Sequence, residues 1–235
     1  MLKIKSLYSG YGKSKVLLDI NITVPAKQIT VIVGPNGAGK TTLLNSVMGL
    51  ATIHSGDVIY MDESIVRIPS YDLTKLGISF VPQKENIFSN LSVRENIVMA
   101  GYLLPKAERN DKMKEIFKLF PALDDFINRK AETLSGGERR MLAIAMGLMR
   151  RPKLLLLDEI TTDLAPIIAK GILKKLVELK DELGVTLLMV EQTARRALEI
   201  ADNAYLLVSG KNRFEGKGDE LLHHPELAKK YLGVA

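Results

Sequence analysis

The sequence predicts an α/β fold built around a parallel sheet, and two stretches of the chain carry that prediction. Residues 29–33 are a continuous β-branched run that leads into a glycine-rich turn, after which residues 41–50 have a helical pattern. Residues 154–157 and 186–190 are apolar strands separated by apolar residues at helical spacing over 166–183. A strand, a helix of this length and a second strand are typical of a parallel pair.

The other segments complete the order of elements. Residues 1–24 alternate between apolar and polar positions, with turns at 9–12 and 25–26, which indicates strands. Residues 56–61 and 77–81 also have strand patterns, whereas residues 93–126 are helical with breaks at Pro105 and Pro121. The sequence contains no tandem repeat, low-complexity tract or long linker. We therefore predict a single domain over residues 1–235.

The composition fits one compact domain and excludes several kinds of site. Of the 235 residues, 46% are hydrophobic and 26% are charged. No apolar run approaches the roughly 20 residues that cross a bilayer, and the first residues lack the apolar stretch and cleavage site of a signal peptide. We therefore expect a protein of the cytosol. The absence of cysteine excludes disulfides, thiolate metal sites and cysteine nucleophiles.

The charge is basic, with a formal net charge of +6 and a pI of about 9.3. Such a surplus fits an anionic partner such as nucleic acid or lipid head groups. However, the basic residues are spread among 27 acids and form only short clusters such as Arg139-Arg140 and Arg150-Arg151. This distribution favours an ordinary solvated surface, and we expect no specific nucleic-acid partner.

The glycine-rich turn has the GxxxxGK[ST] pattern of a phosphate-binding loop. Its glycines let backbone N–H groups turn towards phosphate oxygens, Lys40 adds positive charge, and the Thr41 hydroxyl is a candidate magnesium ligand. A plain glycine turn is the alternative, but the strand before it and the helix after it favour phosphate binding. We predict a P-loop, RecA-like core that binds ATP and Mg²⁺. Its ATP-binding residues are expected to be Gly34, Pro35, Asn36, Gly37, Ala38, Gly39, Lys40, Thr41 and Thr42.

Two carboxylates follow the apolar run at residues 154–157. Asp158 and Glu159 are expected at the carboxyl end of a buried strand, which is where open α/β sheets bind ligands. Asp158 is a candidate magnesium ligand through water, and Glu159 is the candidate catalytic residue that polarises the attacking water. On its own, an Asp-Glu pair after an apolar run would more often mark the point where a strand leaves the core. With the phosphate loop in the same chain, the catalytic interpretation is favoured instead.

A second glycine-rich segment, Leu134-Ser135-Gly136-Gly137-Glu138, precedes a helical run. It is either a backbone cradle for an anion at a helix N-terminus or a plain N-cap in which Ser135 caps the helix. The segment by itself favours neither.

Taken together, the motifs GPNGAGKTT, FVPQ, LSGGE and LLLLDE, in this order, resemble the ATP-binding cassette (ABC) ATPases over essentially the whole chain. The resemblance implies a nucleotide-binding core with an antiparallel β subdomain, over about residues 1–83 and 151–235. It also implies a helical subdomain over about 84–150. In this family two domains pair head to tail, so that ATP on one subunit is covered by the other's signature segment, here Ser135, Gly136, Gly137 and Glu138.

The same resemblance implies two further roles. Gln83 is expected to sense magnesium or its water and to link the core to the helical subdomain. Tyr11 is expected to stack on adenine, although a tyrosine in a Gly-Tyr-Gly turn is often only a surface residue.

Two positions depart from the commonest family pattern. Ala165 replaces the usual aspartate of the intersubunit loop, and Asp163, two positions earlier, is a candidate cap of the next helix. Gln192 stands where most members have a catalytic histidine; its amide still donates a hydrogen bond but carries no charge, so we expect slow turnover. VEQ at 190–192, Leu164-Ala165-Pro166 and the ending Tyr231-Leu232-Gly233 resemble ATPase subunits of branched-chain amino acid importers, although residues 160–163 differ from that subgroup.

We therefore predict an ATPase that drives import of branched-chain or other hydrophobic or polar amino acids. Its expected partners are a second ATPase subunit, identical or related, permease subunits at the inner face of the cell membrane, and indirectly a solute-binding protein. The alternative is a soluble ABC-family ATPase acting on nucleic acid, the ribosome or a protein scaffold, which the basic pI supports. An exporter subunit is a third hypothesis. It is disfavoured because exporters usually keep the histidine that Gln192 replaces here. His223 and His224 do not form a metal-ligand set.

Overall fold

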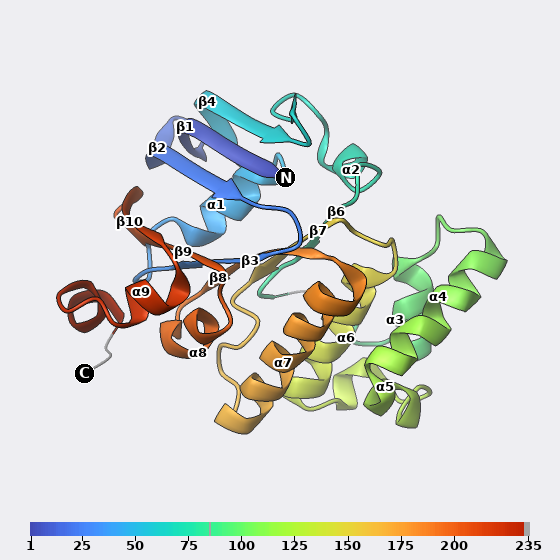
Figure 1. Cartoon of the computed structure of the whole chain (residues 1–235). Helices are drawn as coiled ribbons and strands as arrows, with labels where there is room; N and C mark the ends of the chain where they lie inside the picture. The colour runs from blue at the N-terminus through green and yellow to red at the C-terminus, as the bar shows by residue number, and fades with distance from the viewer. Residues whose placement is uncertain (85, 233–235) are drawn as a thin grey trace.

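The computed structural model describes residues 1–84 and 86–232 and contains two sheets and a helical region (Figure 1). Gly233 of the C-terminal Tyr-Leu-Gly segment lies outside the described residues. The larger sheet has the strand order β10-β9-β3-β8-β7-β6. Its strands are β10 (Lys211–Gly216), β9 (Asn203–Val208), β3 (Ile29–Val33), β8 (Thr186–Glu191), β7 (Leu154–Asp158) and β6 (Ile78–Val81). All neighbours are parallel except β9 and β10, so this sheet is mixed.

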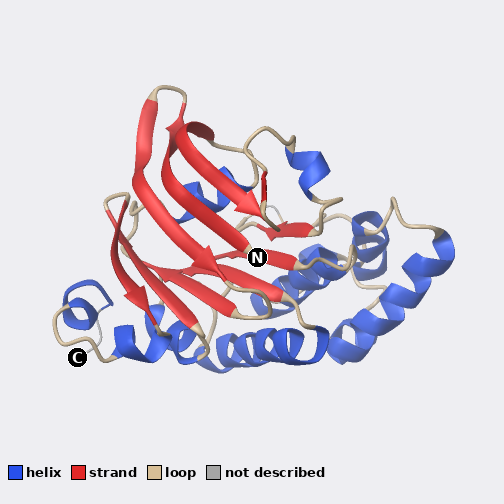
Figure 2. Ribbon diagram, turned by 45° about the horizontal axis from the view of Figure 1, so that its top comes forward, coloured by secondary structure: helices blue, strands red, loops and turns tan. Residues whose placement is uncertain are grey.

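The smaller sheet has the order β2-β1-β4-β5, in which every pairing is antiparallel. Its strands are β1 (Leu2–Tyr11), β2 (Ser14–Val24), β4 (Thr52–Tyr60) and β5 (Glu63–Ser64). Helix α1 (Lys40–Val47) lies between the two sheets, where Leu43, Leu44 and Val47 pack against both (Figures 1 and 2). The antiparallel sheet thus covers one face of the larger sheet.

Helices cover the other face of the larger sheet (Figure 2). Helices α6 (Gly136–Leu148), α7 (Pro166–Leu183) and α8 (Ala194–Glu199) pack on this face. Helices α3 (Val93–Ala100), α4 (Lys106–Leu119) and α5 (Pro121–Asp125) lie to the side of the sheet, where α3 and α5 pack against α6 (Figure 1). Short helices α2 (Ser70–Leu73) and α9 (Gly218–Leu222) lie outside this layer. On β7, Leu155 and Leu157 belong to the helix-side core, while Leu154 and Leu156 belong to the core under the antiparallel sheet. A strand buried on both faces explains why its sequence is continuously apolar rather than alternating.

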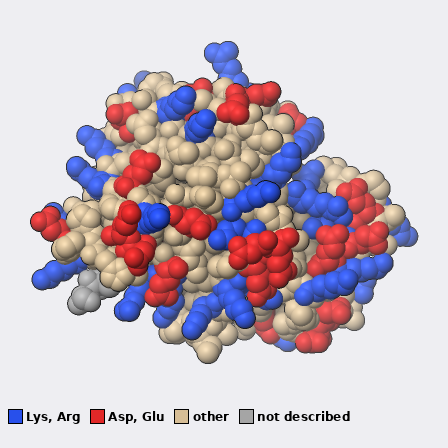
Figure 3. All heavy atoms as spheres, viewed as in Figure 1, with Lys and Arg blue, Asp and Glu red and all other residues tan. Residues whose placement is uncertain are grey.

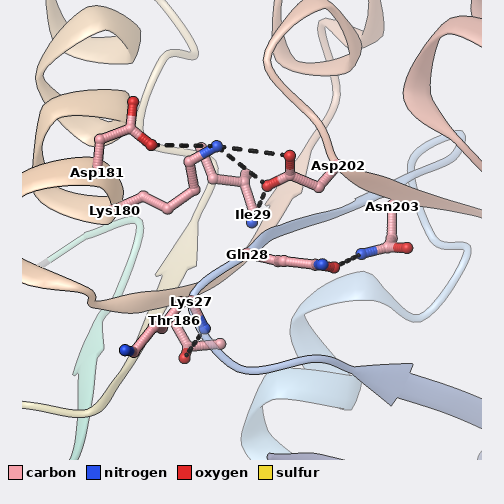
Figure 4. Close-up of polar contacts among 8 residues, drawn as sticks. All are labelled: Lys27, Gln28, Ile29, Lys180, Asp181, Thr186, Asp202 and Asn203. Atoms are coloured by element: carbon pink, nitrogen blue, oxygen red, sulfur yellow. Dashed lines mark hydrogen bonds and ion pairs between the residues drawn. The ribbon is translucent and has the colours of Figure 1, made fainter.

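Polar contacts hold the amino ends of the central strands (Figure 4). The Ile29 N–H donates to Asp202 Oδ2 at 2.8 Å, and Lys180 of α7 pairs with the same carboxylate at 3.3 Å. The Lys27 N–H donates to Thr186 Oγ1 at 2.9 Å, which ties the start of β3 to β8. These contacts fix the amino end of β3, and the phosphate loop follows the carboxyl end of the same strand.

The strands and helices predicted from the sequence are confirmed, including the breaks at Pro105 and Pro121 and the parallel pairing of the strands at 154–158 and 186–191. The turn predicted at residues 9–12 is displaced to 12–13, because β1 continues to Tyr11 in its pairing with β2. The hairpin β9–β10 was not predicted, because its residues give no strong period. The prediction that Asp163 caps the next helix is wrong: α7 begins after Ala165 with Pro166 in its first turn, and no side chain in the described part caps it. Within residues 1–84 and 86–232, no helix is long and apolar enough to cross a bilayer.

Candidate nucleotide-binding site

Four neighbouring parallel strands bring the predicted site residues to one edge of the sheet. In sheet order, β3 leads into the phosphate loop, β8 into Gln192, β7 into Asp158 and Glu159, and β6 into Gln83. Carboxyl ends of parallel strands are where such sheets bind ligands. A cavity of about 420 Å³ opens there, lined by Val16, Asn36, Gly37, Ala38, Gly39, Lys40, Thr41, Thr42, Gln83, Glu159 and Gln192.

Two glycines in the phosphate loop are required by its geometry. A Cβ on Gly34 would lie 2.1 Å from the carbonyl oxygen of Leu207, so the loop passes too close to β9 for any side chain. Gly39 has φ +104°, which L side chains rarely adopt, and precedes α1 as its N-cap. No side chain among the described residues caps α1. The first N–H groups of the helix are therefore available to an anionic ligand.

Lys40 is folded back into the loop that it belongs to. Its side chain is buried, and Nζ donates to the carbonyl oxygens of Gly34 at 2.9 Å and Pro35 at 3.3 Å. It also pairs with Glu159 Oε1 at 3.5 Å. The ammonium thus lies between the phosphate loop and the candidate catalytic carboxylate.

Thr41 and Asp158 place two oxygen ligands side by side. Thr41 Oγ1 donates to Asp158 Oδ1 at 3.2 Å across α1 and β7. Burial raises the pKa of Asp158, while the Thr41 hydroxyl lowers it and the neighbouring Glu159 raises it further. The positive charges of Lys40 and Arg140 also lower the pKa of Asp158. A hydroxyl beside a buried carboxylate suits a hard cation with oxygen ligands. No cluster of three His, Cys, Asp or Glu that could hold a metal occurs among the described residues, so a cation here would rely on water and phosphate for its other ligands.

Glu159 has a strained backbone and two polar neighbours. Its φ of +46° lies in the left-handed region, which costs of order 1–3 kcal/mol for a non-glycine residue. Gln83 Nε2 donates to Glu159 Oε2 at 2.8 Å, while Lys40 faces Oε1. The two neighbours aim the carboxylate into the cavity beside the phosphate loop.

Comparison with known proteins identifies the family. A family model described as "ABC transporter" matches residues 17–162. The chain belongs to the ABC transporter family. It is 46% identical over 234 residues to a probable branched-chain amino acid transport ATP-binding protein, LivF, of Archaeoglobus fulgidus, covering 100% of this chain and 99% of the relative. It is 40% identical to BraG of Pseudomonas aeruginosa, a high-affinity branched-chain amino acid transport ATP-binding protein. This match covers 99% of this chain and 100% of BraG.

Solved structures agree with that assignment. A nucleotide-free ATP-binding cassette from an ABC transporter superposes with a TM-score of 0.88 at 26% identity, covering 97% of each chain. The dimeric post-hydrolysis structure of the ATP-binding cassette MJ0796, bound to ADP and phosphate, superposes with a TM-score of 0.81 at 27% identity. This match covers 92% of this chain and 98% of that one. ABC ATPases bind and hydrolyse ATP, act as dimers and work with membrane permeases. The chain is therefore an ATPase subunit of this family.

The signature segment of this ABC ATPase lies apart from the cavity. Ser135 is the N-cap of α6: Ser135 Oγ accepts from the Glu138 N–H at 3.4 Å, and Glu138 Oε2 accepts from the Ser135 N–H at 2.6 Å. The plain capping interpretation thus describes this segment within one subunit. Ser135 and Gly136 are exposed, and none of the four residues Ser135–Glu138 lines the cavity.

Tyr11 also lies outside the cavity lining. It ends β1, is 48% exposed, and its hydroxyl accepts a hydrogen bond from Asn45 Nδ2 of α1 at 2.8 Å. Val16 lines the cavity instead, and the sequence analysis missed it because an alternating strand gives no sign of which residue touches a ligand. Arg140 was also missed: from α6 it donates to the carbonyl oxygen of Gln83, and burial lowers its pKa. Its position in the signature helix, just after LSGGE, is the only sequence signal for it.

Proposed function

We propose that the chain is the ATP-hydrolysing subunit of an importer of branched-chain or other hydrophobic or polar amino acids. The observation that carries this proposal is the full-length similarity to two branched-chain amino acid transport subunits. VEQ at residues 190–192 and Leu164-Ala165-Pro166 support the same subgroup. The ATPase works at the cytoplasmic face of the cell membrane, and a solute-binding protein acts with it indirectly.

In this proposal, the triphosphate of ATP binds to the backbone N–H groups of residues 34–42 and to Lys40. The ammonium exchanges its contacts with the Gly34 and Pro35 carbonyls for phosphate oxygens. Thr41 and Asp158, with Gln83 nearby, hold the magnesium ion, which supplies positive charge for the phosphates. Tyr11 stacks on the adenine from the rim of the site.

Glu159 is the residue that orients and polarises the attacking water, because its carboxylate is buried beside the phosphate loop. Gln83 holds Oε2 of that carboxylate, so a movement of Gln83 changes the direction in which Glu159 points. Gln192 donates an amide hydrogen bond to the γ-phosphate from the end of β8. Because an amide carries no charge, the hydrogen bond is weaker than one from a charged histidine and turnover is slow.

The site is completed by a second ATPase subunit, identical or related. The segment Ser135–Glu138 of one subunit, in which Ser135 and Gly136 are exposed, covers the ATP held by the other. Ile167, 78% exposed at the start of α7, adds apolar surface next to Ala165, where the family usually has an aspartate. An apolar contact thus takes the place of a charged one at this part of the dimer.

Permease subunits dock on exposed apolar side chains of the helical region. Met99, Tyr102 and Leu103 lie at and just after the end of α3, and all are exposed. Phe88 is exposed too, and its backbone exchanges hydrogen bonds with the buried Asn96 of α3 at 2.7 and 3.0 Å. The loop that follows Gln83 is thereby fastened to the helix that carries the docking surface. Movement of the permease therefore reaches Gln83 and Glu159.

The net charge of +6 favours the nucleic-acid alternative, but the charge distribution on the face shown in Figure 3 does not. On the face shown in Figure 3, Lys and Arg side chains alternate with Asp and Glu and do not form a continuous basic patch. This face therefore lacks the single-sign field that attracts a polyanion.

The decisive experiment is reconstitution of transport. The tagged chain is purified from membranes of its own host, and the integral subunits recovered with it are placed in liposomes with ATP. We expect ATP-dependent accumulation of labelled leucine, isoleucine or valine, and none with Glu159→Gln. Salt-sensitive binding of the chain to duplex DNA or ribosomes, without any membrane subunit, would overturn the proposal.

A further inference from the structure

Glu191 is a buried carboxyl group with one oxygen in use. It is the last residue of β8, and its side chain is 0% exposed. Oε1 accepts a hydrogen bond from the Thr161 N–H at 3.0 Å. Oε2 has no hydrogen-bond partner among the described residues. Burying a carboxyl group is costly, and an apolar residue would avoid that cost, so its presence here calls for a role.

The residue that Glu191 holds is two positions from Glu159. The loop after β7 is fastened to the end of β8 at two places: the Glu159 N–H donates to the Val190 carbonyl at 2.9 Å, and the Thr161 N–H donates to Glu191. Between these contacts the chain leaves Glu159 in its left-handed conformation. Such a conformation persists only where the surroundings hold it on both sides. Glu191 supplies the second contact.

The charge of Glu191 also acts on Arg140 of the helical region. Among the carboxylates around the Arg140 guanidinium of α6, Glu191 has the largest electrostatic effect on the arginine, ahead of Asp163, Asp158 and Glu159. Arg140 in turn donates to the Gln83 carbonyl, and Gln83 holds the Glu159 carboxylate. Glu191 therefore holds the backbone near Glu159 through Thr161, while Gln83 holds the Glu159 side chain and is itself bound by Arg140.

We propose that Glu191 is a positioning residue of the ATPase reaction, which fixes the backbone of Thr161 and thereby holds Glu159 in the direction from which it acts. This inference rests on the proposed role of Glu159. It requires only that Oε1 accepts a hydrogen bond, which a neutral group also does, although more weakly than a carboxylate. Burial raises the pKa of Glu191 to about 7, in keeping with a site that tolerates the neutral form.

The test separates accepting a hydrogen bond from carrying a charge. Glu191→Gln keeps an acceptor oxygen, so we expect its kcat to stay within about threefold of the wild type. Glu191→Leu has a similar volume and no acceptor, so we expect kcat to fall 10- to 100-fold. Affinity for a fluorescent ATP analogue is expected to change less than threefold in both, because the phosphate loop is not touched. A role in folding alone would instead lower stability and leave the kcat of the folded protein unchanged.

Two results would overturn the inference: wild-type kcat in Glu191→Leu, or a loss in Glu191→Gln as large as in Glu191→Leu. The glutamine variant decides the matter even if the leucine variant fails to fold, since a large loss there contradicts the hydrogen-bonding role. Glu159→Gln in the same assay separates this inference from the proposal it rests on. If Glu159→Gln retains wild-type kcat, the role of Glu159 fails; if it is inactive while Glu191→Leu is active, only the positioning role fails.

Discussion

The phosphate loop and the signature segment are both glycine-rich turns at the start of a helix, yet they are built differently. Gly39 precedes α1 with a left-handed φ and no side-chain cap, so the helix begins with free N–H groups beside a cavity. Ser135 precedes α6 in an extended conformation and closes a reciprocal capping box with Glu138. The first helix start has no side-chain cap, whereas in the second the Ser135 and Glu138 N–H groups are already bonded to the Glu138 and Ser135 side chains.

This difference fits the proposal that one segment binds phosphate within a subunit and the other contributes across the dimer. The capping box holds the start of α6 without a ligand, with Ser135 and Gly136 exposed. In the proposal, this segment contributes to a site only when a second subunit presents nucleotide to it. The four predictions below test this division, beginning with the largest expected effect.

Glu159→Gln tests whether the two segments meet around one ATP molecule. Loss of a catalytic carboxylate is expected to lower kcat by roughly 10³-fold, within the range for a general base. ATP stays bound, so size-exclusion chromatography with light scattering should show a dimer that forms only with ATP. Glu132→Gln, an exposed acid near the signature segment, should behave as the wild type. A variant that stays monomeric with ATP and hydrolyses it at the normal rate would contradict the shared site.

The contributions of Glu191 and Glu138 to the free energy of unfolding should change with pH in opposite directions. Burial raises the pKa of Glu191 from 4.5 to about 7, so its contribution to stability is full below pH 4.5 and is lost as the pH rises through 7. The backbone N–H of Ser135 lowers the pKa of Glu138, so the capping box stabilises above the unfolded pKa and is lost as the pH falls. Relative to Glu191→Gln, the wild-type free energy of unfolding should fall by about 3 kcal/mol between pH 4.5 and 8.

Urea titrations at several pH values measure the free energy of unfolding of the wild type and of Glu191→Gln. A difference between wild type and Glu191→Gln that does not depend on pH would show that Glu191 ionises normally in the folded protein. Glu138→Gln should remove the loss at acid pH only.

Lys40→Met tests the open helix start directly. The variant keeps the buried methylene chain but loses the charge, so ATP affinity should fall roughly 10- to 100-fold, as expected for hydrogen bonds to a charged group. A fluorescent ATP analogue measures the affinity. Lys112→Met is the matched control, because Lys112 is equally buried at 5% exposure and pairs with Glu115 away from the cavity. Unchanged affinity in Lys40→Met would exclude the loop as the phosphate site.

Ser135→Ala separates capping from contact with nucleotide. Ser92 of α3 has the same capping box, with Glu95 in place of Glu138, so Ser92→Ala removes an identical cap elsewhere. Both variants should lose about 1 kcal/mol of stability. Only Ser135→Ala should also lower kcat, by roughly tenfold for one lost donor near the phosphates. Equal kcat in the two variants would reduce Ser135 to a helix cap.

Much of the site could be read from the chain because each motif is continuous. Residues 34–42 need only a strand before them and a helix after them, and Asp158 and Glu159 need only a buried strand. Gln83 and Gln192 were found through family resemblance, since an isolated glutamine has no pattern of its own. Val16, Arg140 and Glu191 escaped because their roles depend on neighbours that are distant in sequence. The cap assigned to Asp163 failed because Pro166 sets where α7 begins.

The sequence by itself determined the order of the main elements as far as β8, the pattern of the phosphate loop and the family, since these depend on local periodicity and on spacings within a few residues. The tertiary structure decided which strands lie side by side, and therefore that Gln83, Glu159 and Gln192 line the same cavity as Lys40. It also decided that the signature segment lies outside that cavity, capped and exposed. The physical reason is that packing among distant segments decides which strands lie side by side, and a local sequence pattern does not record that order.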